Sequence, residues 1–192
     1  MKTLVLLCSV TLAACLAEPV RILVCYHSIT GNTEKLAREV QTGAASVDGV
    51  EVTLSKTAEF KAETIIRYDG VLLGSPVHWS NLSAESKAFL DRIGDALWKA
   101  KANGDGRTAG VFCTGGGVAM GKDLVRLSVL SAFLTMRFTV IGGVDDAGFG
   151  TLGPEATTGA GHSGISEKEL AEARRFGERF ARLTLRFRPP GK

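Results

Sequence analysis

Strand-length apolar runs alternate with helical segments along nearly the whole of this 192-residue chain. The runs are rich in aliphatic and β-branched residues, as in strands that are buried on both faces of a parallel sheet. The predicted strands cover 20–26, 50–54, 68–74, 109–113 and 138–141. The predicted helices cover 33–46, 83–98, 122–136 and a last segment from Ser166, which opens a capping box, to about Leu185. This alternation predicts one α/β domain, in which a five-stranded parallel sheet carries helices on both faces.

The composition narrows the class of protein further. It is 45% hydrophobic and 22% charged, which suits a globular body and excludes a disordered or collagen-like chain. The net charge is only +3 and the basic residues are dispersed, so we expect no nucleic-acid partner. No paired cysteine spacing with nearby histidines occurs, so we expect no metal site. Cys25 and Cys113 fall in predicted strands and are expected to be buried; whether they pair depends on whether those strands are neighbours.

The first 19 residues form a probable signal peptide that precedes the predicted domain, 20–188. Met1 and Lys2 precede an apolar run, 4–16, which is too short to span a bilayer as a helix and is typical of a secretory signal. The tetrapeptide ending at Cys15 is similar to the lipobox of bacterial lipoproteins, so Cys15 is a candidate for lipidation and membrane tethering. We therefore expect an exported protein, periplasmic or anchored as a lipoprotein. Cleavage near Ala17, or a mis-called start codon before a cytoplasmic protein, remains open.

Hydroxyl and amide side chains crowd the loop after the first predicted strand. This loop, Ser28-Ile29-Thr30-Gly31-Asn32-Thr33, runs directly into the first predicted helix. In parallel α/β sheets ligands bind at the carboxyl ends of strands, and a phosphate here would meet unpaired N–H groups at a helix N-terminus. Neither G-x-x-x-x-G-K-[ST] nor G-x-G-x-x-G occurs in the loop. The loop predicts either a site for one phosphate group or an ordinary polar turn.

Two further loops follow predicted strands. In 74–81, Trp79 could lie against a planar ring and His78 could donate a hydrogen bond to it; the alternatives are a core plug and an exposed histidine. In 114–121, three consecutive glycines would let backbone N–H groups approach a flat polar ring and stabilise negative charge on it; a flexible loop is the alternative.

The loop Ser28-x-Thr30-Gly31-Asn32-Thr33 resembles the flavodoxin phosphate loop, and the chain over about 21–183 resembles the WrbA group of NAD(P)H:quinone oxidoreductases. The similarity includes Gly74-x-Pro76, the segment from Phe89 to Trp98, and Ala156-Thr157-Thr158. It implies a flavodoxin-like, doubly wound sheet with the strand order 2-1-3-4-5. It also implies one FMN bound by three groups of residues. These are Ser28, Ile29, Thr30, Gly31, Asn32 and Thr33; Pro76, Val77, His78 and Trp79; and Thr114, Gly115, Gly116, Gly117, Val118 and Ala119.

The resemblance also bears on assembly. The WrbA group forms dimers and tetramers, so a homo-oligomer is implied, with Trp98 bordering the acceptor pocket, contributed across a subunit interface. The chain departs from the group at Leu134-Thr135, where a histidine pair is common. His162, before the last helix, either replaces that imidazole or is simply exposed.

The resemblance implies an FMN-dependent enzyme that passes two electrons from NADH or NADPH to a quinone-type acceptor by a ping-pong mechanism. The cofactor would carry the chemistry, so no side chain is assigned as an acid or base. The alternative is a flavodoxin-type electron carrier without a substrate pocket; such carriers are typically acidic, whereas the pI here is about 8.7. A third possibility is an interaction domain without a cofactor. The sequence does not reveal the physiological donor or acceptor, the preferred nicotinamide, or the oligomer size.

Overall fold

The computed structural model describes residues 18–147, 150–159, 161 and 164–188. The predictions for the leader, including its candidate lipidation site at Cys15, and for His162 fall outside these residues. Among the described helices, none combines the length and apolarity needed to cross a membrane.

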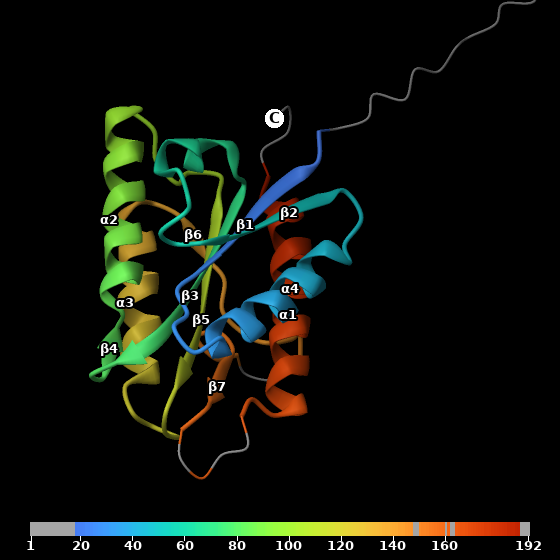
Figure 1. Ribbon diagram of the computed structural model, residues 1–192. Coiled ribbons are helices and arrows are strands. Elements are labelled where there is room, and N and C mark those ends of the chain that lie inside the picture. Colours follow the sequence, from blue (N-terminus) through green and yellow to red (C-terminus); the bar gives the residue numbers. More distant parts are fainter. Residues whose placement is uncertain (1–17, 148–149, 160, 162–163, 189–192) are drawn as a thin grey trace, which may run out of the picture.

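A five-stranded parallel sheet forms the centre of the molecule, as predicted (Figure 1). In chain order its strands are β1 (Val20–Tyr26), β2 (Val50–Lys56), β3 (Gly70–His78), β5 (Thr108–Gly115) and β6 (Thr139–Val140). Their order across the sheet is β2-β1-β3-β5-β6. Counted along the chain among these five alone, this is the order 2-1-3-4-5, so the doubly wound fold is confirmed.

Two short strands and one short helix were not predicted. β4 (Asn81–Leu82) pairs antiparallel with the end of β3, and β7 (Glu155–Thr157) pairs parallel with the end of β5. The 3-10 helix η1 (Ala62–Arg67) lies between β2 and β3. β3 and β5 thus extend two to four residues beyond the predicted strands, to the edge where the candidate ligand loops begin.

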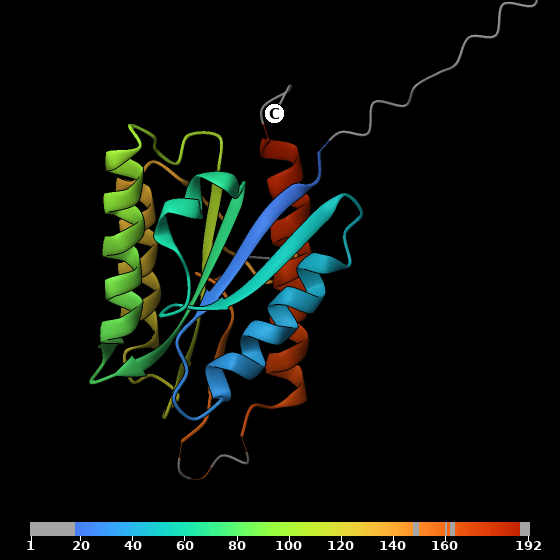
Figure 2. The ribbon, with the colours of Figure 1, turned by 45° about the horizontal axis from the view of Figure 1, so that its top comes forward.

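Helices cover both faces of the sheet. Figures 1 and 2 show α1 and α4 on one face and α2 and α3 on the other. The helices are α1 (Asn32–Ala45), α2 (Ala84–Lys99), α3 (Lys122–Thr135) and α4 (Glu167–Phe187). Successive residues of a strand point to opposite faces, so Leu23 of β1 packs in the core beneath α2 and α3, whereas Ile22 packs beneath α1 and α4. The apolar runs of the central strands β1, β3 and β5 therefore reflect burial on both sides, whereas the edge strand β2 has no fully buried residue.

The helices α1 and α4 cross unusually closely because glycines lie at the contact. A Cβ atom on Gly177 would lie 2.0 Å from the carbonyl oxygen of Val40, and one on Gly43 would lie 1.8 Å from that of Arg174. Backbone therefore packs on backbone here. This crossing fixes the axis of α1, whose first residues belong to the candidate phosphate loop.

The two described cysteines do not form a disulfide. Cys25 lies on β1 and Cys113 on β5, and β3 separates these strands, so the pairing that the sequence left open does not occur. Both thiols are buried, and burial raises the pKa of Cys113 to about 12 and that of Cys25 well above its ordinary value. Both cysteines therefore act as small core residues in the protonated form.

Candidate functional site

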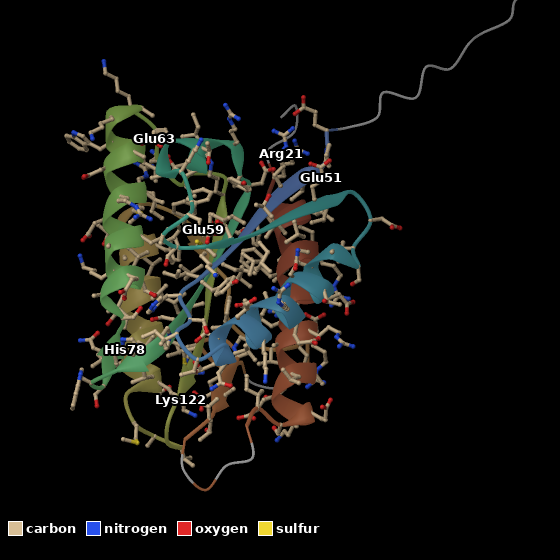
Figure 3. The ribbon with its side chains drawn as sticks, viewed as in Figure 1. Arg21, Glu51, Glu59, Glu63, His78 and Lys122 are labelled. Atoms are coloured by element: carbon tan, nitrogen blue, oxygen red, sulfur yellow. The ribbon has the colours of Figure 1, made fainter. Side chains whose placement is uncertain are left out.

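Three loops meet at the carboxyl edge of the sheet. We call them the first loop (27–31), the second loop (77–82) and the third loop (115–121). The first and second loops touch through the rings of His27 and His78, whose centroids are 5.7 Å apart. The second and third loops touch so closely that a Cβ atom on Gly121 would lie 2.6 Å from the backbone of Ser80. Figure 3 shows His78 and Lys122 at this same edge.

The first loop leaves hydrogen-bonding groups free at the start of α1. Gly31 caps this helix in the left-handed region (φ 84°), and within the described residues no side chain caps it. By contrast, Ser83 and Ser166 cap α2 and α4 through their hydroxyls. The Oγ of Ser28 is buried without a hydrogen-bond partner among the described residues. Free N–H groups beside a buried, unpartnered hydroxyl are what a phosphate group requires.

Two other side chains of the predicted phosphate site already have partners. The Nδ2 of Asn32 donates to the Oγ1 of Thr30 at 3.2 Å. Thr33 is buried, and its Oγ1 lies 2.8 Å from the Oγ1 of Thr114 on β5. Thr33 therefore ties the first loop to the strand that leads into the third loop.

The second loop presents Trp79 to solvent. Its side chain is fully exposed (101%), so it does not plug the core, and its backbone φ of 50° lies in the left-handed region together with that of Ser80 (61°). Two consecutive left-handed residues other than glycine are energetically unfavourable and are typical of functional loops. His78 is half-buried and pairs with Asn81 across the β3–β4 turn.

The third loop combines glycine backbone with exposed apolar side chains. Gly115 and Gly116 lie against the segment that follows β7, where the N–H of Thr158 donates to the carbonyl oxygen of Gly115 at 2.8 Å. Gly121 begins α3 in the left-handed region (φ 80°), with no side-chain cap from the described residues. Val118 and Met120 are exposed. This loop can therefore offer a flat ring both N–H groups and apolar contacts.

A buried ionic network beneath the third loop was not predicted. Lys122 is only 3% exposed; its Nζ donates to Thr157 Oγ1 at 2.9 Å and pairs with Glu155 at 2.8 Å. Arg126 also pairs with Glu155. The network clamps β7 to the start of α3. The position of Lys122 just after the glycine run could have drawn attention to it, but its partners lie more than 30 residues away in the sequence and could not be identified from it.

His27 was also missed, although it directly precedes the predicted phosphate site. Its Nδ1 lies 2.9 Å from the Oγ of Ser83 and 3.6 Å from a carboxylate oxygen of Glu85. Burial lowers the pKa of His27, Glu85 opposes this effect, and His78 adds to it. The sequence feature that could have identified His27 is its place directly after a buried strand, at the edge where ligands bind.

Trp98 lies far from the three loops of its own chain. α2 starts beside β4 and runs to the opposite edge of the sheet (Figure 1), and Trp98 is 14 residues beyond its first residue, or about 21 Å at 1.5 Å per residue. There it borders a hollow of about 330 Å³ that Thr135 and Met136 also line. Within one copy of the chain, Trp98 therefore does not border the site. A contribution across a subunit interface stays a prediction.

The comparisons with known proteins agree with this geometry. A family model described as a flavodoxin domain matches residues 23–105. A flavodoxin of Aquifex aeolicus (strain VF5) is 34% identical over 161 residues, which cover 84% of this chain and 85% of that protein. The chain belongs to the flavodoxin family.

Two further similarities concern proteins that carry other names. A probable NAD(P)H dehydrogenase (quinone) FQR1-like 2 of Arabidopsis thaliana is 27% identical to this chain over 212 residues, which cover 94% of this chain and 77% of that protein. The crystal structure of the flavodoxin, WrbA-like protein from Agrobacterium tumefaciens superimposes with a TM-score of 0.68 at 21% identity. That match covers 88% of this chain and 99% of the other.

Membership of the flavodoxin family implies FMN as the cofactor, and the residues present fit it. The free N–H groups at the start of α1 and the unpartnered Ser28 Oγ suit the phosphate. Trp79 and the glycine backbone of the third loop suit a planar ring with a polar edge.

The anchoring of β7 should depend on pH through Glu169. Its carboxylate accepts hydrogen bonds from the N–H of Thr157 (2.8 Å) and from the N–H and Oγ of Ser166 (2.8 and 2.7 Å). Burial alone would raise the pKa of Glu169, but these hydrogen bonds outweigh it and the net pKa is lowered. A lowered folded-state pKa contributes stability above the unfolded-state pKa, and that stability is lost as the pH falls through the folded-state value.

We therefore expect the wild type to lose more stability than Glu169→Gln between about pH 5 and about pH 3, by on the order of 0.5 kcal/mol after allowance for solvent screening. Urea denaturation at the two pH values measures this difference. The exposed Glu167 of the same helix turn, changed to Gln, is the control. Equal losses for the wild type and Glu169→Gln would contradict the assignment.

Proposed function

We propose that the chain is an FMN-dependent oxidoreductase that transfers two electrons from NADH or NADPH to a quinone-type acceptor. The observation that carries this proposal is the chemistry of the rim around the three loops. Ile29, Trp79, Val118 and Met120 are all exposed there. The three loops themselves contain no Asp or Glu. The loops therefore expose four large apolar side chains and carry no acidic residue of their own; the nearest carboxylates, such as Glu85, belong to the helices that follow the loops.

Such a rim suits a neutral planar molecule better than it suits a charged protein surface. A quinone gains from apolar and aromatic contacts, for which Trp79 offers a fully exposed ring. A carrier that docks on redox proteins relies on complementary charge to steer and orient the encounter. The similarity to a plant NAD(P)H dehydrogenase (quinone) and to a WrbA-like protein supports an enzymatic function over electron carriage.

When bound, FMN supplies the redox chemistry, and the chain supplies binding, orientation and exclusion of water. The first loop would hold the phosphate through main-chain N–H groups and Ser28. The backbone of the third loop would donate hydrogen bonds to the polar edge of the ring. Trp79 would cover part of the site, and in an assembled oligomer Trp98 of a second copy would complete the acceptor pocket.

The alternative function is electron carriage, which the 34% identity to a flavodoxin favours. An exported or membrane-anchored location, which we keep as part of the proposal for the full chain, would favour it too, because soluble NAD(P)H is scarce outside the cytoplasm.

Anaerobic stopped-flow mixing of the FMN-loaded chain with NADH and with NADPH tests the proposal. We expect at least one of them to bleach the yellow absorption bands, and 1,4-benzoquinone added afterwards to restore them. Bands that persist with both nicotinamides would contradict the enzyme. A redox titration that accumulates a one-electron-reduced form would then identify the carrier.

A further inference from the structure

The three loops contain two imidazole side chains, and these two touch. They are His27, at the end of β1, and His78, at the end of β3. The rings meet edge to face, with an interplanar angle of 85° and 5.7 Å between centroids. His78 adjoins the exposed Trp79, whereas the His27 side chain is only 14% exposed. His78 therefore lies on the rim, and His27 lies behind it.

A chain of hydroxyl groups fixes the orientation and the tautomer of His27. The Oγ of Ser83 accepts from the N–H of Ser86 at 3.2 Å and donates to the Oγ of Ser86 at 2.9 Å. Its one hydrogen is thus used, so the Nδ1 of His27, 2.9 Å away, must donate to it. Neutral His27 consequently keeps its lone pair on Nε2. The N–H of Ser83 also donates to the Oγ of Ser75, which anchors this chain of groups to β3.

The charges around the pair oppose double protonation. Two elements pack against His27: α2 brings the carboxylate of Glu85 to 3.6 Å, and β3 brings His78. Glu85 favours the protonated form of His27, whereas burial and a protonated His78 disfavour it. The net effect is a lowered pKa of His27, with burial as the largest cause, so His27 is held mainly in its neutral form beside His78.

The proposed reaction requires one proton that the electron donor does not supply. Its balance is NAD(P)H + H⁺ + quinone → NAD(P)⁺ + hydroquinone. The hydride carries both electrons and one hydrogen nucleus to the acceptor, so one quinone oxygen still lacks a proton. The loops hold no Asp, Glu, Lys, Tyr or Cys that could provide it.

We propose that His78 donates this proton to the quinone oxygen and that His27 is the positioning residue that orients His78 and keeps it ready to release the proton. This assignment rests on the proposed function and adds an acid to it. Solvent reprotonates His78 at the exposed rim after each turnover. Glu85 and Ser83 act only through His27.

The first test measures the quinone step alone, so its outcome does not depend on which nicotinamide is the electron donor. The full chain, loaded with FMN and reduced with one equivalent of dithionite, is mixed with 1,4-benzoquinone, and the return of the yellow bands is followed. We expect His78→Gln to slow this step about 100-fold near neutral pH, within the usual range for loss of a general acid. The wild-type rate should fall at alkaline pH, where an imidazole no longer carries a proton to donate, and the variant rate should be nearly independent of pH.

Variants at His27 separate positioning from packing. Asn at position 27 places an N–H close to the position of Nδ1, so it preserves the bond to Ser83 but cannot titrate. We expect His27→Asn to slow the quinone step about 10-fold and to shift its pH profile, with FMN affinity unchanged. If His27→Asn reproduces the wild-type pH profile, the positioning role is wrong.

NMR titration of the imidazoles in the FMN-loaded chain gives a readout that is independent of turnover. Glu85→Gln should lower the pKa of His27 further, and His78→Gln should raise it. Glu63→Gln, an exposed carboxylate at the opposite edge of the molecule (Figure 3), should leave it unchanged. A wild type that benzoquinone cannot oxidise would sink the proposed function. A reactive wild type matched by His78→Gln would sink only the assignment of His78.

Discussion

Replacing Gly177 with alanine should lower the free energy of unfolding by about 3 kcal/mol, at the upper end of the usual range for overpacking. The added Cβ would lie 2.0 Å from the carbonyl oxygen of Val40 and 2.9 Å from the N–H nitrogen of Ala44. Neither is the end of a flexible side chain, so the whole of α1 must move away from α4. Because α1 begins at the phosphate loop, the FMN affinity of the protein that still folds should fall as well.

Gly94→Ala is the matched control, because it adds the same atom to the interior of another helix. Its Cβ would meet only the end of the Met136 side chain, at 3.4 Å. Alanine is the better helix former, so Gly94→Ala should be neutral or stabilising by about 0.5–1 kcal/mol. Urea denaturation of both variants measures the difference. Equal stabilities would show that the backbone contact between α1 and α4 is not tight in solution.

The sequence predicted the main elements of the fold because each carries its own local signal. β1 was predicted with the bounds that the structure shows, since all of its residues except the exposed Arg21 are apolar and buried. β4 and β7 were missed because only two or three residues form each, and their pairing depends on strands distant in the sequence. η1 has two buried residues in six, too few for a helical pattern to show.

The site was predictable where it follows strand ends, and not where it depends on packing. The three loops were found because the carboxyl ends of neighbouring parallel strands meet at one edge. Lys122 and His27 were missed because their roles come from Glu155, Thr157 and Ser83, which folding alone brings near. Trp98 was assigned to the acceptor pocket by resemblance, although the predicted helix 83–98 already implied that Trp98 lies a full helix length from the loop edge; the structure confirms that distance.

Removal of the two hydroxyls of the first loop should abolish most of the preference for FMN over riboflavin. Ser28→Ala/Thr30→Ala takes away the unpartnered Oγ of Ser28 and the exposed hydroxyl of Thr30, but leaves the N–H groups of α1 in place. Hydrogen bonds to a charged group are each worth about 1.5–3 kcal/mol, so the double variant should bind FMN at least about 100-fold more weakly. Quenching of flavin fluorescence on titration measures both affinities.

Riboflavin lacks the phosphate group, so its affinity distinguishes the loss of phosphate contacts from damage to the part of the site that binds the ring. Its affinity should be the same in the wild type and the double variant, because the ring contacts Trp79 and the third loop rather than the first. Thr42→Ala/Ser46→Ala removes the same two kinds of hydroxyl at the far end of α1, where both bond to backbone carbonyls, and should leave FMN affinity unchanged. The first loop contains no Lys or Arg, so no permanently charged side chain in it can replace the lost hydroxyls. If the double variant retained wild-type affinity for FMN, the two hydroxyls would not contribute to phosphate binding, and this part of the assignment would be wrong.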